Sequence, residues 1–130
     1  MKARLFAIFT LLMLGFSSHV FAVGLGAIKV QSGLNEPFKA QIKLEKVGDL
    51  SESDLIFGLA SAEEFEKRKM TRDAYYTSIQ FKLDMKHPGG PVILLSSDRI
   101  LKEPSLDLLV KLSWPTGNIV RGYTVLLEKP

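Results

Sequence analysis

The stretch LDLLVKLSWPTGN, residues 106–118, decides the fold more than any other part of the chain. Every second residue from Leu106 to Trp114 is apolar, and Asp107, Lys111 and Ser113 are among the residues between them. Because successive side chains of a strand point to opposite faces, this alternation predicts a half-buried strand. The following PTGN segment supplies a fixed φ and a Gly that accepts positive φ, which predicts a turn. The chain should then return as a second strand over Ile119–Leu127, forming a C-terminal hairpin.

The same period of two recurs earlier in the chain. Phe38–Leu44 and Ile79–Lys86 alternate apolar and polar residues at every step. Shorter or continuous apolar runs predict three further strands, over Ala27–Gln31, Leu55–Ala60 and Val92–Ser96. Seven short strands separated by turns predict an all-β fold, an immunoglobulin-like antiparallel β-sandwich with one short helix. The Cys–Trp–Cys signature of antibody domains is absent, so a small barrel is the alternative.

A single helix is expected before the Ile79–Lys86 strand. Ser61 with Glu64 three residues later is a capping-box pattern, and acidic residues precede basic ones in the order that suits the helix dipole. These signals predict a helix over Ala62–Lys69 with Phe65 facing the core. The run Lys67-Arg68-Lys69 could bind phosphate or nucleic acid, but basic residues that end an acidic helix are usually a solvated face.

The first 22 residues have the three parts of a secretory signal. A basic start is followed by an apolar run over Leu5–Phe16 and then by a short segment that ends at Ala22. The apolar run is about twelve residues long, and a membrane span needs about twenty. We therefore expect a signal peptide over residues 1–22, cut after Ala22, a single exported domain over residues 23–130, and no membrane span once the signal is removed.

The charge pattern argues against nucleic acid as a partner. The chain has 17 Lys and Arg against 14 Asp and Glu, a net charge of +3. Lys2 and Arg4 belong to the predicted signal, so most of the excess that would suggest a nucleic-acid or anionic-membrane binder is removed with it. The chain has no Cys, so no disulfide can form and the fold must rest on its apolar core.

Few residues are suited to catalysis. His19 lies in the predicted signal, which leaves His87, in a His-Pro-Gly-Gly-Pro turn, as the one imidazole. No G-x-S-x-G elbow is present for a serine hydrolase, and one His without any Cys gives a zinc ion too few ligands. The adjacent carboxylates Glu63 and Glu64 are explained by the first turn of the helix. We therefore expect no enzyme, no metal and no cofactor.

Binding is the better prediction. Aromatic rings stack on the apolar faces of sugars, and Trp114, Tyr75 and Tyr76 could form such a shelf. Tyr123 could contribute to the shelf as well, but Trp114 and Tyr123 are better explained as core residues on opposing strands of the hairpin. On a strand, Tyr75 and Tyr76 would point to opposite faces, so at least one would lie at the surface. Glu103, next to Pro104 at the entry of a strand, could face a groove. The open edges of a sandwich also allow a partner strand to pair.

Five segments keep an order and a spacing that characterise one family. They are GLGAIKVQSGLNEPFKAQI (24–42), LASAEEF (59–65), SS with KEPSL (96–97 and 102–106), WPTG (114–117) and RGYTVLL (121–127). In this order they resemble the N-terminal periplasmic domain of FimV-type proteins, also called HubP-type polar landmark proteins. Gly122 departs from the pattern, because the family often has an acidic residue there.

The resemblance covers nearly all of residues 23–130. It implies a periplasmic module, linked to the inner membrane, of bacteria that build type IV pili. Proteins of this kind organise the cell pole, support pilus assembly and twitching motility, and contact the cell wall. The family also carries a LysM motif, a transmembrane helix and a long acidic cytoplasmic region, none of which is present in these 130 residues. It offers no catalytic residues to transfer.

We therefore predict a non-enzymatic exported interaction domain that contacts envelope or pilus-machinery proteins. A second hypothesis is a peptidoglycan- or glycan-binding module that uses Tyr75, Tyr76 or Trp114. A third is a periplasmic chaperone that donates a strand to subunits, since the edge of a sandwich permits it. A hydrolase is the weakest of the hypotheses.

Overall fold

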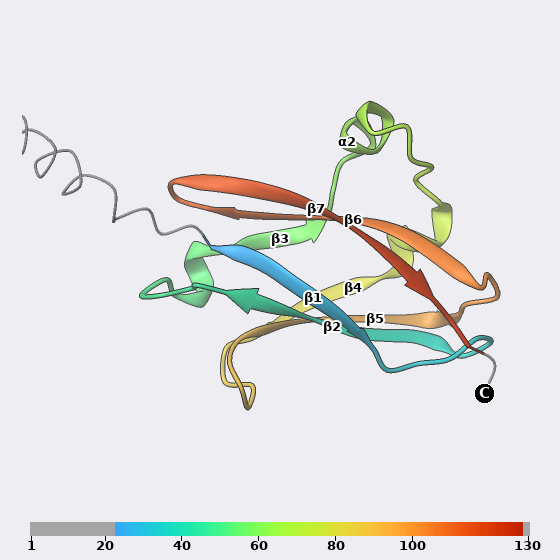
Figure 1. Ribbon diagram of the computed structural model, residues 1–130, viewed down its shortest axis with the longest axis horizontal. Coiled ribbons are helices and arrows are strands. Elements are labelled where there is room, and N and C mark those ends of the chain that lie inside the picture. Colours follow the sequence, from blue (N-terminus) through green and yellow to red (C-terminus); the bar gives the residue numbers. More distant parts are fainter. Residues whose placement is uncertain (1–22, 129–130) are drawn as a thin grey trace, which may run out of the picture.

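A computed structural model describes residues 23–128 as two antiparallel β-sheets that face each other (Figure 1). The strands, in chain order, are β1 (Gly24–Val30), β2 (Pro37–Glu45), β3 (Ile56–Leu59), β4 (Gln80–Asp84), β5 (Val92–Ile100), β6 (Ser105–Trp114) and β7 (Gly117–Leu126). One short helix, α2 (Ala62–Lys67), and two 3-10 turns, η1 (Glu52–Asp54) and η2 (Ala74–Ser78), lie between strands. The predicted immunoglobulin-like sandwich with one short helix is confirmed. The predicted signal peptide, residues 1–22, lies outside the described residues.

The two sheets have four and three strands. Their orders are β1-β2-β5-β4 and β3-β6-β7, and every neighbouring pair is antiparallel. β6 and β7 pair over their whole length, from Ser105 opposite Leu126 to Trp114 opposite Gly117. The C-terminal hairpin that the 106–118 stretch predicted is therefore present.

The core fills the space between the sheets. β2 shows the predicted alternation clearly, because Phe38, Ala40, Ile42 and Leu44 are buried and the residues between them are not. Cross-strand partners share a face, so Ile42 lies in one buried row with Ile93 of β5. Burying an apolar side chain of this size contributes about 1.5–3 kcal/mol. Because the chain has no Cys, this packing stabilises the sandwich without any covalent crosslink.

A hydrogen-bonded clamp joins the first strand to the last across the side of the sandwich. The pairing of β1 with β2 is irregular between Leu25 and Ile28. The Tyr123 hydroxyl in β7 donates to the Gly26 carbonyl oxygen over 2.6 Å, and Nη1 of Arg121 donates to the Leu25 carbonyl oxygen over 2.6 Å. The Arg121 guanidinium also lies 4.9 Å from the centre of the Tyr123 ring. The clamp therefore satisfies carbonyl groups of β1 at the point where its ladder is disturbed.

The α2 helix ends at Lys67, two residues before the predicted end. The Ser61 side chain accepts the Glu64 N–H over 3.3 Å, so the predicted cap at its start is confirmed. At its other end, Lys69 has a left-handed φ of 55°, and the N–H of the next residue returns to the Phe65 carbonyl oxygen over 2.9 Å. This is a common way for a helix to stop. Phe65 is buried, as predicted.

We expect Gly26→Ala to destabilise the fold. A Cβ atom at this position would lie 2.8 Å from the Lys43 carbonyl oxygen, which is backbone and cannot rotate away. Overpacking of this kind costs about 1–3 kcal/mol. Gly58→Ala is the matched control, because a Cβ there meets nothing within 4 Å, and Ala is favoured over Gly inside a strand by about 0.5–1 kcal/mol. Urea unfolding measures both variants, and equal stabilities would contradict the close approach at Gly26.

The Tyr123 phenol should make the stability of the fold depend on alkaline pH. Burial raises the pKa of Tyr123 to about 12 from an ordinary value of 10.0, although the Arg121 charge lowers it in part. The folded state therefore holds this proton more tightly than the unfolded chain does. The stabilisation that the protonated Tyr123 phenol gives the fold has its full value below pH 10.0, where the phenol is protonated in both states. It is lost between pH 10.0 and about 12, because the phenol ionises at lower pH in the unfolded chain than in the folded protein.

Urea unfolding of the wild type and of Tyr123→Phe over this pH range measures the effect. The Tyr123→Phe variant should be less stable at neutral pH, since the Gly26 carbonyl loses its partner. The difference in unfolding free energy between the two proteins should shrink as the pH rises through 10.0 toward 12. Burial also raises the pKa of Tyr76, but Tyr76 is present in both proteins. If the difference in unfolding free energy stayed constant with pH, the conclusion that burial raises the pKa of Tyr123 would be contradicted.

Candidate functional site

Tyr75 and Tyr76 lie in the η2 turn, so the expectation that they alternate between the faces of a strand is wrong. Asp73 caps this turn, because its Oδ1 atom accepts the Tyr75 N–H over 2.9 Å. An Asp side chain that bonds to backbone two residues later favours a turn over an extended strand. The strand predicted over residues 79–86 begins only after the turn, at Gln80.

Both tyrosine hydroxyls hold η2 against the sheets. Tyr76 is 6% exposed, and its hydroxyl accepts the Asp107 N–H of β6 over 3.0 Å. Burial raises the pKa of the Tyr76 phenol, which keeps the hydroxyl protonated. The Tyr75 hydroxyl donates to the Arg99 carbonyl oxygen of β5 over 2.6 Å. Both side chains therefore have a structural role, and little of the Tyr76 ring is left for stacking on a sugar.

Trp114 lines a surface pocket of about 400 Å³ near the start of β1. The other lining residues are Val23, Lys46, Val47, Gly48, Asp49, Leu50 and Thr116. The indole is partly buried and packs against the core, so Trp114 is both a core neighbour and a surface residue. An aromatic ring beside a carboxylate and an ammonium group, in a largely apolar hollow, can hold a sugar ring.

The loop that follows β2 supplies most of this pocket and was not predicted from the sequence. Lys46 has a left-handed φ of 55° and Gly48 one of 59°, so the chain folds back sharply here. The adjacent Gly48 and Asp49 were the available signal, since both residue types favour turns. No alternation or motif connects this loop with Trp114, which is more than sixty residues away in the sequence.

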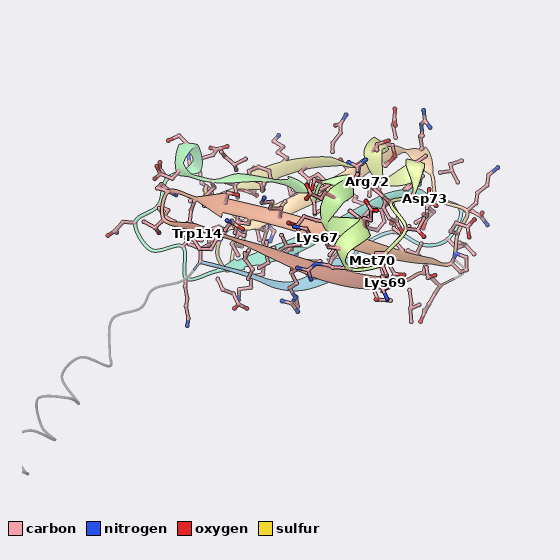
Figure 2. The ribbon with its side chains drawn as sticks, turned by 90° about the horizontal axis from the view of Figure 1, so that it is seen from above. Lys67, Lys69, Met70, Arg72, Asp73 and Trp114 are labelled. Carbon is pink, nitrogen blue, oxygen red and sulfur yellow. The ribbon has the colours of Figure 1, made fainter. Side chains whose placement is uncertain are left out.

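The four predicted binding residues do not form one surface. Figure 2 shows Trp114 toward one end of the sandwich and Asp73, the residue that begins η2, toward the other. Trp114 and the two tyrosines therefore cannot share one stacking shelf. Glu103 is exposed in the turn between β5 and β6. That any of these residues binds a ligand stays a prediction.

β3 leaves an edge of the three-stranded sheet open. It pairs with β6 on one side only. Ile56 of this strand is 73% exposed, and Gly58 has open space where a side chain would stand. Beyond the sheet ladder, the described part of the chain makes no backbone–backbone hydrogen bond to residues 56–59. Unpaired N–H and C=O groups of an edge strand are a template for another strand.

His87 lines a second hollow, of about 300 Å³, on the outer face of the four-stranded sheet. Lys29, Gln41 and Lys43 line it as well. His87 Nδ1 lies 3.6 Å from Asp84 Oδ2. Across residues 23–128, no three His, Cys, Asp or Glu side chains lie close enough together to hold a metal ion. The hollow thus offers hydrogen-bond donors and positive charge.

The helices of residues 23–128 are all too short and too polar to cross a membrane.

These observations define an immunoglobulin-like domain whose surface carries an aromatic pocket, an open strand edge and a basic hollow. Residues 23–130 match the family model of the FimV N-terminal Ig-like domain, and the chain belongs to this family. The resemblance inferred from the five sequence segments is therefore confirmed.

The curated relatives of the chain include the motility hub protein FimV of two Pseudomonas aeruginosa strains, PAO1 and UCBPP-PA14. Each is 41% identical to the chain over 114 residues. The match covers 88% of this chain and 12% of each relative, so the chain spans a small part of the proteins that it resembles. No solved structure shows a significant match.

Proposed function

We propose that this chain is a non-enzymatic interaction domain that supports bacterial motility by binding proteins of the cell envelope. Its membership of the FimV N-terminal family carries this proposal, because the relatives are named motility hub proteins. The domain acts in the periplasm after cleavage behind Ala22, and its partners belong to the type IV pilus or cell-pole machinery. Such a role needs contact surfaces and no reacting groups.

The open edge of β3 is the surface that fits a protein partner best. An extended segment of the partner can add beside β3 as a further strand, with main-chain hydrogen bonds supplying affinity. Ile56 offers an exposed apolar anchor, and Gly58 lets another backbone approach closely. The strand, IFGL, also lacks the Lys or Pro residues with which proteins usually protect an edge from pairing.

Ile56→Lys should weaken partner binding about tenfold and reduce twitching motility of the host. Removing an apolar anchor of this size costs about 1.4 kcal/mol or more, and a charge on an edge strand opposes pairing. Because Ile56 is 73% exposed, the stability of the fold should change by no more than about 0.5 kcal/mol. Leu126→Lys is the matched control, since Leu126 is 76% exposed at the end of the other edge strand, β7.

In-cell crosslinking tests the same surface directly. A photoreactive amino acid at position 56 should capture a pilus or cell-pole protein of the envelope, and the same amino acid at position 126 should not. Cell fractionation of the same strains reports whether the chain is periplasmic. Normal motility of the Ile56→Lys strain, or equal capture from both positions, would show that the β3 edge is not the contact.

Sugar binding at Trp114 is the second candidate function, and the 400 Å³ pocket that Trp114 lines favours it. Trp114 is the one tryptophan of the chain, so its fluorescence reports on the pocket alone. Soluble peptidoglycan fragments should change this fluorescence with saturation. Trp114→Phe should keep part of the binding to purified cell-wall sacculi, and Trp114→Ala should lose most of it, since stacking needs an aromatic face.

Tyr75→Phe serves as the control for these measurements, because it changes an aromatic residue outside the pocket. Unchanged fluorescence at high fragment concentration, together with no co-sedimentation of the wild type with sacculi, would eliminate the sugar-binding function. That result would leave the protein-binding function at β3 standing.

A further inference from the structure

Four lysines lie together on the outer face of the four-stranded sheet. The pairing registers place Lys29, Gln41, Leu94 and Lys82 in one row across β1, β2, β5 and β4. The flanking rows add Lys39, opposite Ser96, and Lys43, opposite Val92. Directly paired residues of antiparallel strands share a face, and all four lysines are exposed. We call Lys29, Lys39, Lys43 and Lys82 the lysine face.

The four lysines outnumber the carboxylates that share this face with them. Asp84 stands opposite Val92 in the row of Lys43, and Glu45 ends β2 opposite Gly24. Within the described residues, none of the four lysines has a carboxylate oxygen within 4.0 Å. Like charges on neighbouring strands repel, so the folded protein holds these cations together at a cost that a negative ligand would remove. The small net charge of the whole chain conceals this asymmetry.

The opposite face of the sandwich is built differently. α2 and the segment after it lie over the three-stranded sheet (Figure 1). On this sheet Leu109, which pairs with Gly122 on the outer row, is fully buried. Within residues 23–128, no helix lies over the outer face of the four-stranded sheet (Figure 1). The inner strands β2 and β5 are paired on both sides, and β1 and β4 are the edge strands. A partner that approaches the flat of the sheet therefore meets the side chains of the lysine face first.

The residue types point to a flat anionic surface as the partner. Protein contact sites usually depend on Trp, Tyr or Arg anchors, and the rows of the lysine face contain none of these. Lysine is a hydrated point charge on a flexible stem, and it lacks the fork with which Arg recognises a fixed carboxylate or phosphate. A fluid layer of charged head groups needs no fixed geometry. We propose that the lysine face docks on anionic phospholipid head groups.

This docking leaves the protein-binding surface free. β3 belongs to the other sheet, so a domain that rests on the membrane by its lysine face keeps the β3 edge accessible. Each lysine near an anionic bilayer strengthens binding about fivefold, and four together give several hundredfold. Attraction of this size is reversible and falls as salt screens it. The inference does not depend on the proposed motility function, and the two are tested separately.

Vesicle co-sedimentation tests the proposal. The exported protein, purified as the host processes it, is mixed with vesicles of phosphatidylcholine with or without one quarter phosphatidylglycerol. We expect binding to the phosphatidylglycerol vesicles, loss of binding at high salt, and none to phosphatidylcholine alone. Changing all four lysines of the lysine face to Gln should weaken binding at least a hundredfold. Circular dichroism checks the fold, which exposed substitutions should leave intact.

The matched control removes the same charge from the other side of the molecule. Lys67, Arg68, Lys69 and Arg72 are exposed in and after α2, and Lys67, Lys69 and Arg72 are labelled in Figure 2. Lys67 lies 3.8 Å from Glu63, an exposed pair whose loss costs little stability. Changing these four residues to Gln gives a protein of the same net charge, and its vesicle binding should fall by less than threefold.

Three results would overturn the proposal. Equal losses in the two variants would show that net charge, and not the lysine face, controls binding. Equal binding to vesicles with and without phosphatidylglycerol would show that apolar contact, and not attraction to anionic head groups, holds the protein on the vesicle. Binding to sacculi that depends on the lysine face, without binding to vesicles, would assign the face to the cell wall. The Ile56→Lys variant tests the protein contact at β3 and does not change the lysine face. A negative result with that variant therefore does not contradict docking on phospholipid head groups, and the reverse also holds.

Discussion

The contact on which the rest of the structure depends is the clamp between β1 and β7. Two sheets without a disulfide are held mainly by apolar packing, which has little directionality and does not by itself fix how the sheets sit. The Tyr123 hydroxyl and the Arg121 guanidinium add directed bonds from one sheet to carbonyl oxygens of the other. Because Gly26 has no side chain, the clamp can form where β1 passes close to β2. The side of the sandwich opposite β3 is closed in this way.

Most of the fold could be predicted from the sequence, because strands with one buried face must alternate. The stretches at residues 38–44, 79–86 and 106–114 showed this period, and the structure has strands in all three. Prediction failed where a local hydrogen bond decided the outcome. Asp73 holds Tyr75 and Tyr76 in a turn, and Lys69 adopts the left-handed conformation that ends α2, although neither feature interrupts the apolar pattern.

The candidate sites were harder to predict than the fold. Trp114 was singled out from the sequence, but the residues that make its pocket follow β2 and are brought near only by the sandwich. The lysine face is likewise divided among three strands, and each lysine taken alone is an ordinary exposed residue of an alternating pattern. Pairing register turns such separate positions into a surface, and register is a property of the sheet rather than of any one segment. Family membership likewise follows from the match over residues 23–130 and not from any single residue.

The direction of the end strands has a mechanical consequence. Figure 1 shows β1 and β7 running the same way, with β1 starting toward one end of the sandwich and β7 ending toward the other. A pull on the two ends of the domain would therefore load the clamp along the strands, in shear. Bonds arranged in this way must break together rather than one after another. A domain so built resists a pull along its long axis more than it would if the clamp could open one bond at a time.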